Sequence, residues 1–161
     1  DMAASELTVT AGNAPWLNDG ASALVVTSLA YANTHGLEPL ARITGYATGG
    51  GEPRDLFFAP IVAVQNLMRQ AGTKIGDYDL IEANEAFASQ AIADGNALGW
   101  DWKRVNVNGG AIALGHPIGA SGARVLTTLL YAMRDRDAHT GLATLCLGGG
   151  NAVALSVERM P

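Results

Sequence analysis

Five glycines surround one histidine between Asn108 and Gly122, in the sequence Asn-Gly-Gly-Ala-Ile-Ala-Leu-Gly-His-Pro-Ile-Gly-Ala-Ser-Gly. Glycine permits backbone conformations and close approaches that a Cβ atom forbids. So dense a cluster around His116 predicts backbone that wraps tightly around a titratable group, with a helix beginning near Ala120. A loop of this kind indicates a reactive centre.

Two further segments carry reactive side chains at the ends of apolar, strand-like runs. Cys146, the only cysteine, is followed closely by the three glycines 148–150, and Asn84 comes directly after the apolar run 79–83. An amide, an imidazole and a thiol, each on a glycine-rich or strand-end turn, are the side chains that acyl transfer requires.

Composition excludes several classes of protein. The 161 residues are 48% hydrophobic and 16% charged, which favours one ordinary globular domain over disorder. A net charge of −5 argues against nucleic acid as a partner. No apolar run is long enough for a membrane span, and the first residues lack the features of a signal peptide. A single cysteine allows no intrachain disulfide and suits a cytoplasmic location.

Strand and helix signals alternate along the chain, which predicts an α/β fold with helices on both faces of a mixed sheet. We expect strands at 7–10, 23–28, 40–47, 79–83, 105–107, 142–146 and 153–158. We expect helices at 29–34, 60–71, 85–98 and 120–134.

Six sequence blocks, which together span nearly the whole chain, closely resemble the C-terminal part of thiolases, in particular the acetyl-CoA acetyltransferase type. They are Thr10–Ala14, Asn18–Ala21, Asn84–Ala88, Asn106–Ala123, Cys146–Gly150 and Val157–Arg159. Their order is that of the family, which makes the match far more specific than a single motif. The resemblance implies a thiolase-like α/β fold, whose αβαβα layers are complete only with a partner chain.

The resemblance also implies a role for each reactive residue. Cys146 is the acid/base cysteine. His116 activates the nucleophile and donates to one oxyanion hole, Asn84 holds the water that completes this hole, and the Gly148 N–H serves a second hole. The positions expected to contact substrate are Ala14, Trp16, Leu17, Leu56, Ala86, Phe87 and Ile118. The substrate is a coenzyme A thioester; no metal or redox cofactor is implied, and the histidines and cysteine lack metal-ligand spacing.

One departure from the family concerns the nucleophilic cysteine, which lies in the N-terminal half of thiolases. Cys146 is the acid/base cysteine by its Gly-Gly-Gly context, so the nucleophile must come from elsewhere. We expect a second chain that carries the N-terminal thiolase half, in a hetero-oligomer such as a dimer of heterodimers, with a genetic or proteolytic break between the two. In this hypothesis residues 1–38 complete the partner's domain, and residues 39–161 form the C-terminal thiolase domain.

Other departures concern the substrate. Pro15 and Trp16 stand where the family usually has Ser-Gly, and Leu56, Phe57, Phe58 and Ala59 replace small or flexible residues. These aromatic residues are either pocket lining or ordinary core and interface residues.

The residues alone leave the roles of the reactive groups open as well. Cys146 is either catalytic or an inert buried thiol, Asn84 is either catalytic or a helix cap, and Glu85 is explained by the helix dipole alone. The alternative function is a non-catalytic thiolase-fold subunit that binds and shapes a partner enzyme.

Overall fold

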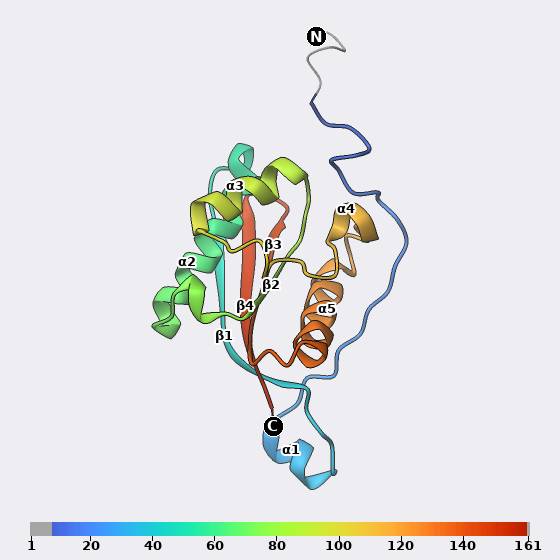
Figure 1. Ribbon diagram of the computed structural model, residues 1–161, viewed down its shortest axis with the longest axis vertical. Coiled ribbons are helices and arrows are strands. Elements are labelled where there is room, and N and C mark those ends of the chain that lie inside the picture. The colour runs from blue at the N-terminus through green and yellow to red at the C-terminus, as the bar shows by residue number, and fades with distance from the viewer. Residues whose placement is uncertain (1–7, 161) are drawn as a thin grey trace.

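A four-stranded mixed sheet forms the centre of the molecule (Figure 1). The computed structural model describes residues 8–160. The strands are β1 (Ala41–Gly50), β2 (Leu80–Ala83), β3 (Thr140–Leu147) and β4 (Asn151–Arg159), and their order across the sheet is β1-β4-β3-β2. β2 runs parallel to β3, whereas β4 is antiparallel to both of its neighbours.

Helices cover both faces of this sheet, as the alternation of signals predicts. α2 (Ala59–Ala71) and α3 (Ala88–Leu98) lie on one face and α5 (Ser121–Asp135) lies on the other (Figure 1). Each face has its own apolar core. The first contains Val64, Leu67, Leu98, Leu142 and Ala154, and the second contains Leu80, Val125, Leu129, Ala143 and Val157.

Glycine lets the helices lie unusually close to the strands. A Cβ atom on Gly49 of β1 would lie 2.3 Å from the backbone nitrogen of Ala63 in α2. On the other face, a Cβ on Gly141 of β3 would lie 2.5 Å from the sulfur of Met133 in α5. Both contacts are shorter than van der Waals packing allows, so the helix positions depend on these glycines.

The remaining helical elements are short. They are α1 (Leu29–Thr34), η2 (Pro53–Phe58), η3 (Ile75–Asp77) and α4 (Ala111–Leu114). Ser28 caps α1, because its hydroxyl oxygen accepts a hydrogen bond of 3.1 Å from the N–H of Tyr31.

Three predicted strands are wrong within the described residues. Residues 8–10 and 23–28 form no strand, and Leu7 lies outside the described range. A strand needs a neighbour for its backbone, and none of the described sheet lies beside these segments. The predicted strand 105–107 is reduced to a single bridge between Val105 and Ile81, because Asn106 has a φ of 47° and leaves the extended conformation.

The helix predicted from residue 85 begins at Ala88 instead. Phe87 is extended, with φ −152° and ψ 152°. The N–H of Ala86 donates to the side-chain oxygen of Gln90 over 3.0 Å. A side chain of α3 therefore holds the preceding segment outside the helix.

Residues 8–28 run as an extended segment past α4 and α5 (Figure 1). Five of its large apolar side chains are exposed, namely Val9, Trp16, Leu17, Val25 and Val26. Two backbone hydrogen bonds attach it to the domain: the Ala88 N–H donates to the Asn13 carbonyl over 2.9 Å, and the His116 N–H donates to the Trp16 carbonyl over 2.8 Å. Within residues 8–160 no helix combines the length and apolarity that crossing a membrane requires.

The close packing of β1 on α2 predicts that Gly49→Ala destabilises the protein. The new Cβ would collide with helix backbone, and such overpacking typically costs about 1–3 kcal/mol. Gly51→Ala is the matched control, because nothing lies within 4 Å of a Cβ at Gly51. Urea unfolding of both purified variants measures the difference, and equal midpoints would contradict the prediction.

Candidate active site

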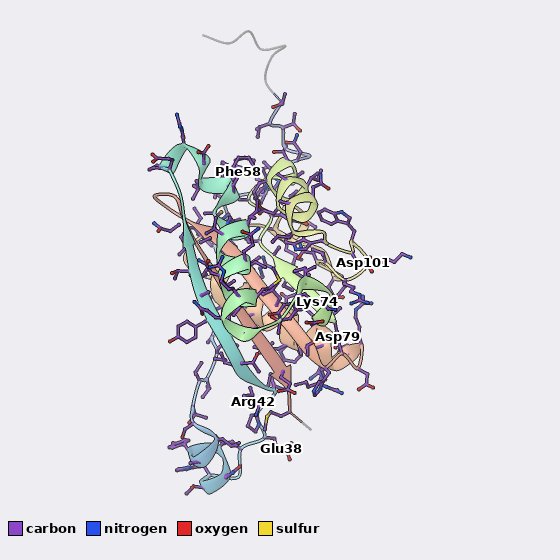
Figure 2. All side chains as sticks on the ribbon, turned by 90° about the vertical axis from the view of Figure 1, so that its left-hand side faces the viewer. Glu38, Arg42, Phe58, Lys74, Asp79 and Asp101 are labelled. Atoms are coloured by element: carbon purple, nitrogen blue, oxygen red, sulfur yellow. The ribbon has the colours of Figure 1, made fainter. Side chains whose placement is uncertain are left out.

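The candidate catalytic residues gather at one edge of the sheet, where β2 and β3 end. These two strands are parallel, so their carboxyl ends meet at the same edge. Asn84 comes directly after β2, and its N–H donates to the Thr144 carbonyl over 3.0 Å. Cys146 lies two residues further along β3. Figure 2 shows Phe58 toward this end of the molecule and Arg42 and Asp79 toward the other.

The loop that follows α4 brings His116 to this edge. Gly115 has a φ of 94°, and a Cβ on it would lie 2.3 Å from the side-chain oxygen of Asn18. The His116 imidazole Nε2 lies 3.5 Å from the amide Nδ2 of Asn84. The structure thus brings together two of the predicted catalytic residues, Asn84 from the end of β2 and His116 from the glycine-rich loop.

The neighbours of His116 determine which ring nitrogen carries the proton. The Ser121 hydroxyl donates its only proton to the Pro117 carbonyl over 3.0 Å. His116 Nδ1 lies 2.6 Å from the same oxygen. With the hydroxyl proton directed at the carbonyl, Nδ1 is the donor in this contact, and the Nε2 lone pair faces the amide N–H group of Asn84.

Burial and the positive charge of Arg124 lower the pKa of His116. The imidazole is therefore neutral near pH 7. A neutral imidazole with a free Nε2 lone pair can accept a proton from a thiol.

Glu85 and Asn106 hold the loop in place, although sequence patterns attribute other roles to them. The Asn106 side chain pairs with the backbone of Ala83 through two hydrogen bonds of 2.9 Å and donates to Glu85 over 3.0 Å. Glu85 also accepts from the N–H of Ile112 over 3.1 Å. A Cβ on Gly110 would overlap the Glu85 carboxyl group. In the sequence, the run Asn-Val-Asn-Gly-Gly at 106–110 is typical of a turn, and it was the signal that could have indicated this role of Asn106.

Cys146 lies on the opposite face of the sheet from Asn84. Side chains alternate along a strand, so Cys146 shares its face with Leu142, which packs in the α2 and α3 core. Asn84 shares its face with Leu80, which packs in the core beside α5. Among the described residues, no hydrogen bond joins the Cys146 thiol to Asn84 or His116.

The Cys146 thiol is half-buried, and burial raises its pKa. The nearby carboxyl group of Asp94, in α3, raises this pKa further. Asp94 is itself fully buried, and burial raises its own pKa to about 7, against the opposing effect of a hydrogen bond from Gln90. No sequence pattern singled out Asp94, because its importance comes from burial that depends on the tertiary fold.

The predicted substrate-contact residues lie on four segments around this edge. Phe87 packs edge-to-face against Phe57, with ring centres 5.1 Å apart, and the neighbouring Leu56 is half-buried in η2. Ala86 is buried beside Asn84. Ala14, Trp16 and Leu17 lie on the extended segment that passes His116, with the side chains of Trp16 and Leu17 exposed. Ile118 is exposed and lines a hollow of about 420 Å³ between residues 18–22 and 117–120.

The second oxyanion-hole candidate, Gly148, begins the turn between β3 and β4. Gly149 and Gly150 follow with φ values of 77° and 85°, which favour glycine. The Asn151 side chain donates to the Gly148 carbonyl over 3.3 Å. Within residues 8–160 no group of three or more His, Cys, Asp or Glu side chains is placed to hold a metal ion.

Comparison with known proteins identifies the family. The family described as "Thiolase, C-terminal domain" matches residues 37–159. The chain belongs to the thiolase family. It is 58% identical over 153 residues to an acetyl-CoA acetyltransferase of Escherichia coli (strain K12), an alignment that covers 95% of this chain and 39% of the relative. It is 59% identical over 154 residues to that of Paracoccus denitrificans, covering 96% and 39%.

Solved structures of thiolases agree with this assignment. An acetyl-CoA acetyltransferase of Bacillus anthracis superposes with a TM-score of 0.93 at 44% identity, covering 95% of this chain and 39% of that protein. A human mitochondrial 3-ketoacyl-CoA thiolase superposes with a TM-score of 0.88 at 39% identity, with the same coverage. The chain therefore has the thiolase C-terminal domain fold and spans about 39% of the length of these thiolases.

The position of Asp94 in this thiolase domain predicts that Asp94→Asn lowers the pKa of Cys146. Above about pH 7 the Asp94 carboxyl group is ionised, and its charge opposes ionisation of the thiol. Below that pH the carboxyl is protonated, so the variant and the original should react alike. The rate at which iodoacetamide alkylates the Cys146 peptide, followed against pH by mass spectrometry, measures the shift.

Asp135→Asn is the control, because its side chain is exposed on the far end of α5. An unchanged alkylation profile in Asp94→Asn would show that this carboxyl does not act on the thiol.

Proposed function

We propose that this chain is the C-terminal catalytic part of an acetyl-CoA acetyltransferase. The reaction is Claisen condensation of two acyl-CoA molecules, or thiolysis of a 3-ketoacyl-CoA in the reverse direction. One observation carries the proposal: the Nε2 atom of His116 faces the Asn84 amide at the sheet edge where β3, which carries Cys146 near its end, lies beside β2. The names of the closely related acetyl-CoA acetyltransferases support it.

In this mechanism His116 first acts as a base. Nε2 takes the proton of the nucleophilic thiol, and the thiolate attacks the acyl thioester. Nε2 then carries a proton and becomes a donor. The Asn84 Nδ2 group lies 3.5 Å away and, once Nε2 is protonated, can donate to a water that faces the same oxygen as Nε2. That arrangement would stabilise the negative oxygen of an enolate, with a water held by Asn84 completing the hole.

Cys146 acts in the second half of the reaction, and unlike His116 it begins in the protonated form. Its raised pKa keeps the thiol protonated at rest, so it must lose a proton before it acts as a base. In this proposal the coenzyme A thiolate that leaves during acylation accepts that proton. The resulting Cys146 thiolate then removes an α-proton from the second acyl-CoA, and the Gly148 N–H stabilises the tetrahedral species.

The nucleophile in this proposal comes from an N-terminal thiolase part, since Cys146 is the only cysteine among the 161 residues. The finer form of the proposal places that part on a second chain, in a dimer of heterodimers. The segment up to residue 38 would complete the N-terminal domain, and residues 39–161 would form the C-terminal domain. The exposed apolar side chains between Val9 and Val26 support this assignment, because they need a cover.

A Cys146→Ala variant of the assembled enzyme should abolish condensation, because nothing then removes the α-proton. Acylation of the nucleophilic cysteine by acetoacetyl-CoA or acetyl-CoA should persist and appear as an acetyl adduct in intact-protein mass spectrometry. Normal condensation by this variant would remove Cys146 from the mechanism.

Native mass spectrometry of the protein purified from its source tests the finer form. A second polypeptide in an assembly that carries out acetoacetyl-CoA thiolysis would support the split arrangement. An inactive homo-oligomer of this chain would contradict the proposed function.

A further inference from the structure

A buried ion pair lies beside Asn84, at the oxygen of its side-chain amide. Glu82 is two residues before Asn84 on β2, so the two side chains share the face that α5 covers. Glu82 is only 1% exposed, and its carboxylate lies 3.8 Å from a guanidinium nitrogen of Arg124, near the start of α5. Another guanidinium nitrogen, Nη2, donates to the side-chain oxygen of Asn84 over 3.2 Å.

This contact decides which way the Asn84 amide points. An arginine side chain can donate hydrogen bonds but cannot accept them. The Asn84 atom that faces Arg124 must therefore be the carbonyl oxygen, which turns the amide N–H group toward His116 Nε2. With the amide turned the other way, an acceptor would face the space where negative charge develops in the proposed reaction.

Glu82 in turn holds Arg124. Neither carboxylate oxygen of Glu82 has a hydrogen-bond partner within residues 8–160. Burial raises the pKa of Glu82 to about 7, and the charge of Arg124 opposes that rise. A pair this buried adds little net stability, because desolvation offsets the attraction between the charges. The attraction favours a guanidinium position beside Glu82, although Nε and Nη1 of Arg124 make no hydrogen bond within residues 8–160.

We propose that Arg124 is a positioning residue for the enolate-forming step, and that Glu82 holds Arg124 in place. The inference rests on the proposed function, because it assigns Asn84 to the oxyanion hole. Arg124 touches no reacting atom. It donates a hydrogen bond to Asn84, and its charge also lowers the pKa of His116. The two half-reactions are therefore compared at about pH 8, where an imidazole is neutral even without that charge. Loss of Arg124 should then slow α-proton removal and spare acylation of the nucleophile, which does not use the Asn84 amide.

The test separates these two half-reactions in the assembled enzyme. Deuterium exchange into the methyl group of acetyl-CoA, followed by NMR in D₂O, reports enolate formation. The acetyl adduct, followed by rapid-quench mass spectrometry, reports acylation. The variants are Arg124→Gln, Arg124→Lys and Glu82→Gln. Arg134→Gln is the matched control, because it removes an exposed arginine from the same helix.

We expect Arg124→Gln to slow exchange about 10- to 100-fold, the range for losing a hydrogen bond from a charged group. Its acylation rate should stay near that of the original enzyme. Arg124→Lys should recover part of the exchange, because one ammonium group can reach either Asn84 or Glu82 but not hold both. Glu82→Gln should slow exchange by a smaller factor than Arg124→Gln, and Arg134→Gln should slow neither reaction.

Equal loss of exchange and acylation in Arg124→Gln would indicate general disruption and overturn the proposal, as would full retention of exchange. A Glu82→Gln enzyme with unchanged exchange would overturn the part that concerns Glu82. An original enzyme that shows neither half-reaction would instead refute the proposed function itself, so the two failures are distinguishable.

Discussion

The parallel pairing of β2 with β3 is the constraint on which the rest of the molecule depends. The register that joins Ala83 to Thr144 brings the ends of two strands, 61 positions apart in the chain, to one edge of the sheet. Asn84 and Cys146 extend this edge, and the loop before α5 adds His116. Alternation along the strands then sends Asn84 toward α5 and Cys146 toward α3. Each reactive group therefore has a different protein environment although they share one edge.

Where the sheet ends, side chains rather than a neighbouring strand form hydrogen bonds with the backbone. Asn106 hydrogen-bonds to the backbone of Ala83 much as a neighbouring strand would, while its positive φ turns the chain away. Glu85 ties this turn to the start of α4 through Ile112. These buried polar contacts satisfy backbone groups that would otherwise lack partners, and they fix the glycine-rich loop without a regular element.

Short sequence patterns predict correctly those helices and strands whose signals lie within the element itself. Apolar residues at helical spacing after Pro60 predict α2, and the predicted end at residue 71 is confirmed. Strands 23–28 and 105–107 were wrong because a strand exists only by pairing, and pairing is not encoded in composition. Asn84, His116 and Cys146 stand out because motifs surround them. Asp94 and Arg124 could not be found this way, since only the packed structure shows that they are buried beside those residues.

On each face of the sheet at this edge, the surroundings shift the pKa of the reactive group so that the group stays uncharged. On the α5 face, burial and Arg124 lower the pKa of His116, which keeps the imidazole neutral. On the α3 face, burial and Asp94 raise the pKa of Cys146, which keeps the thiol neutral. Neither group therefore carries a buried charge at rest. In the proposed reaction His116 becomes charged only when it takes the proton of the nucleophilic thiol, and Cys146 becomes charged only when the leaving coenzyme A thiolate takes its proton. Arg124 faces Glu82, whose carboxyl group has its pKa raised by burial to about 7, and donates to the Asn84 amide without becoming the proton donor in the reaction.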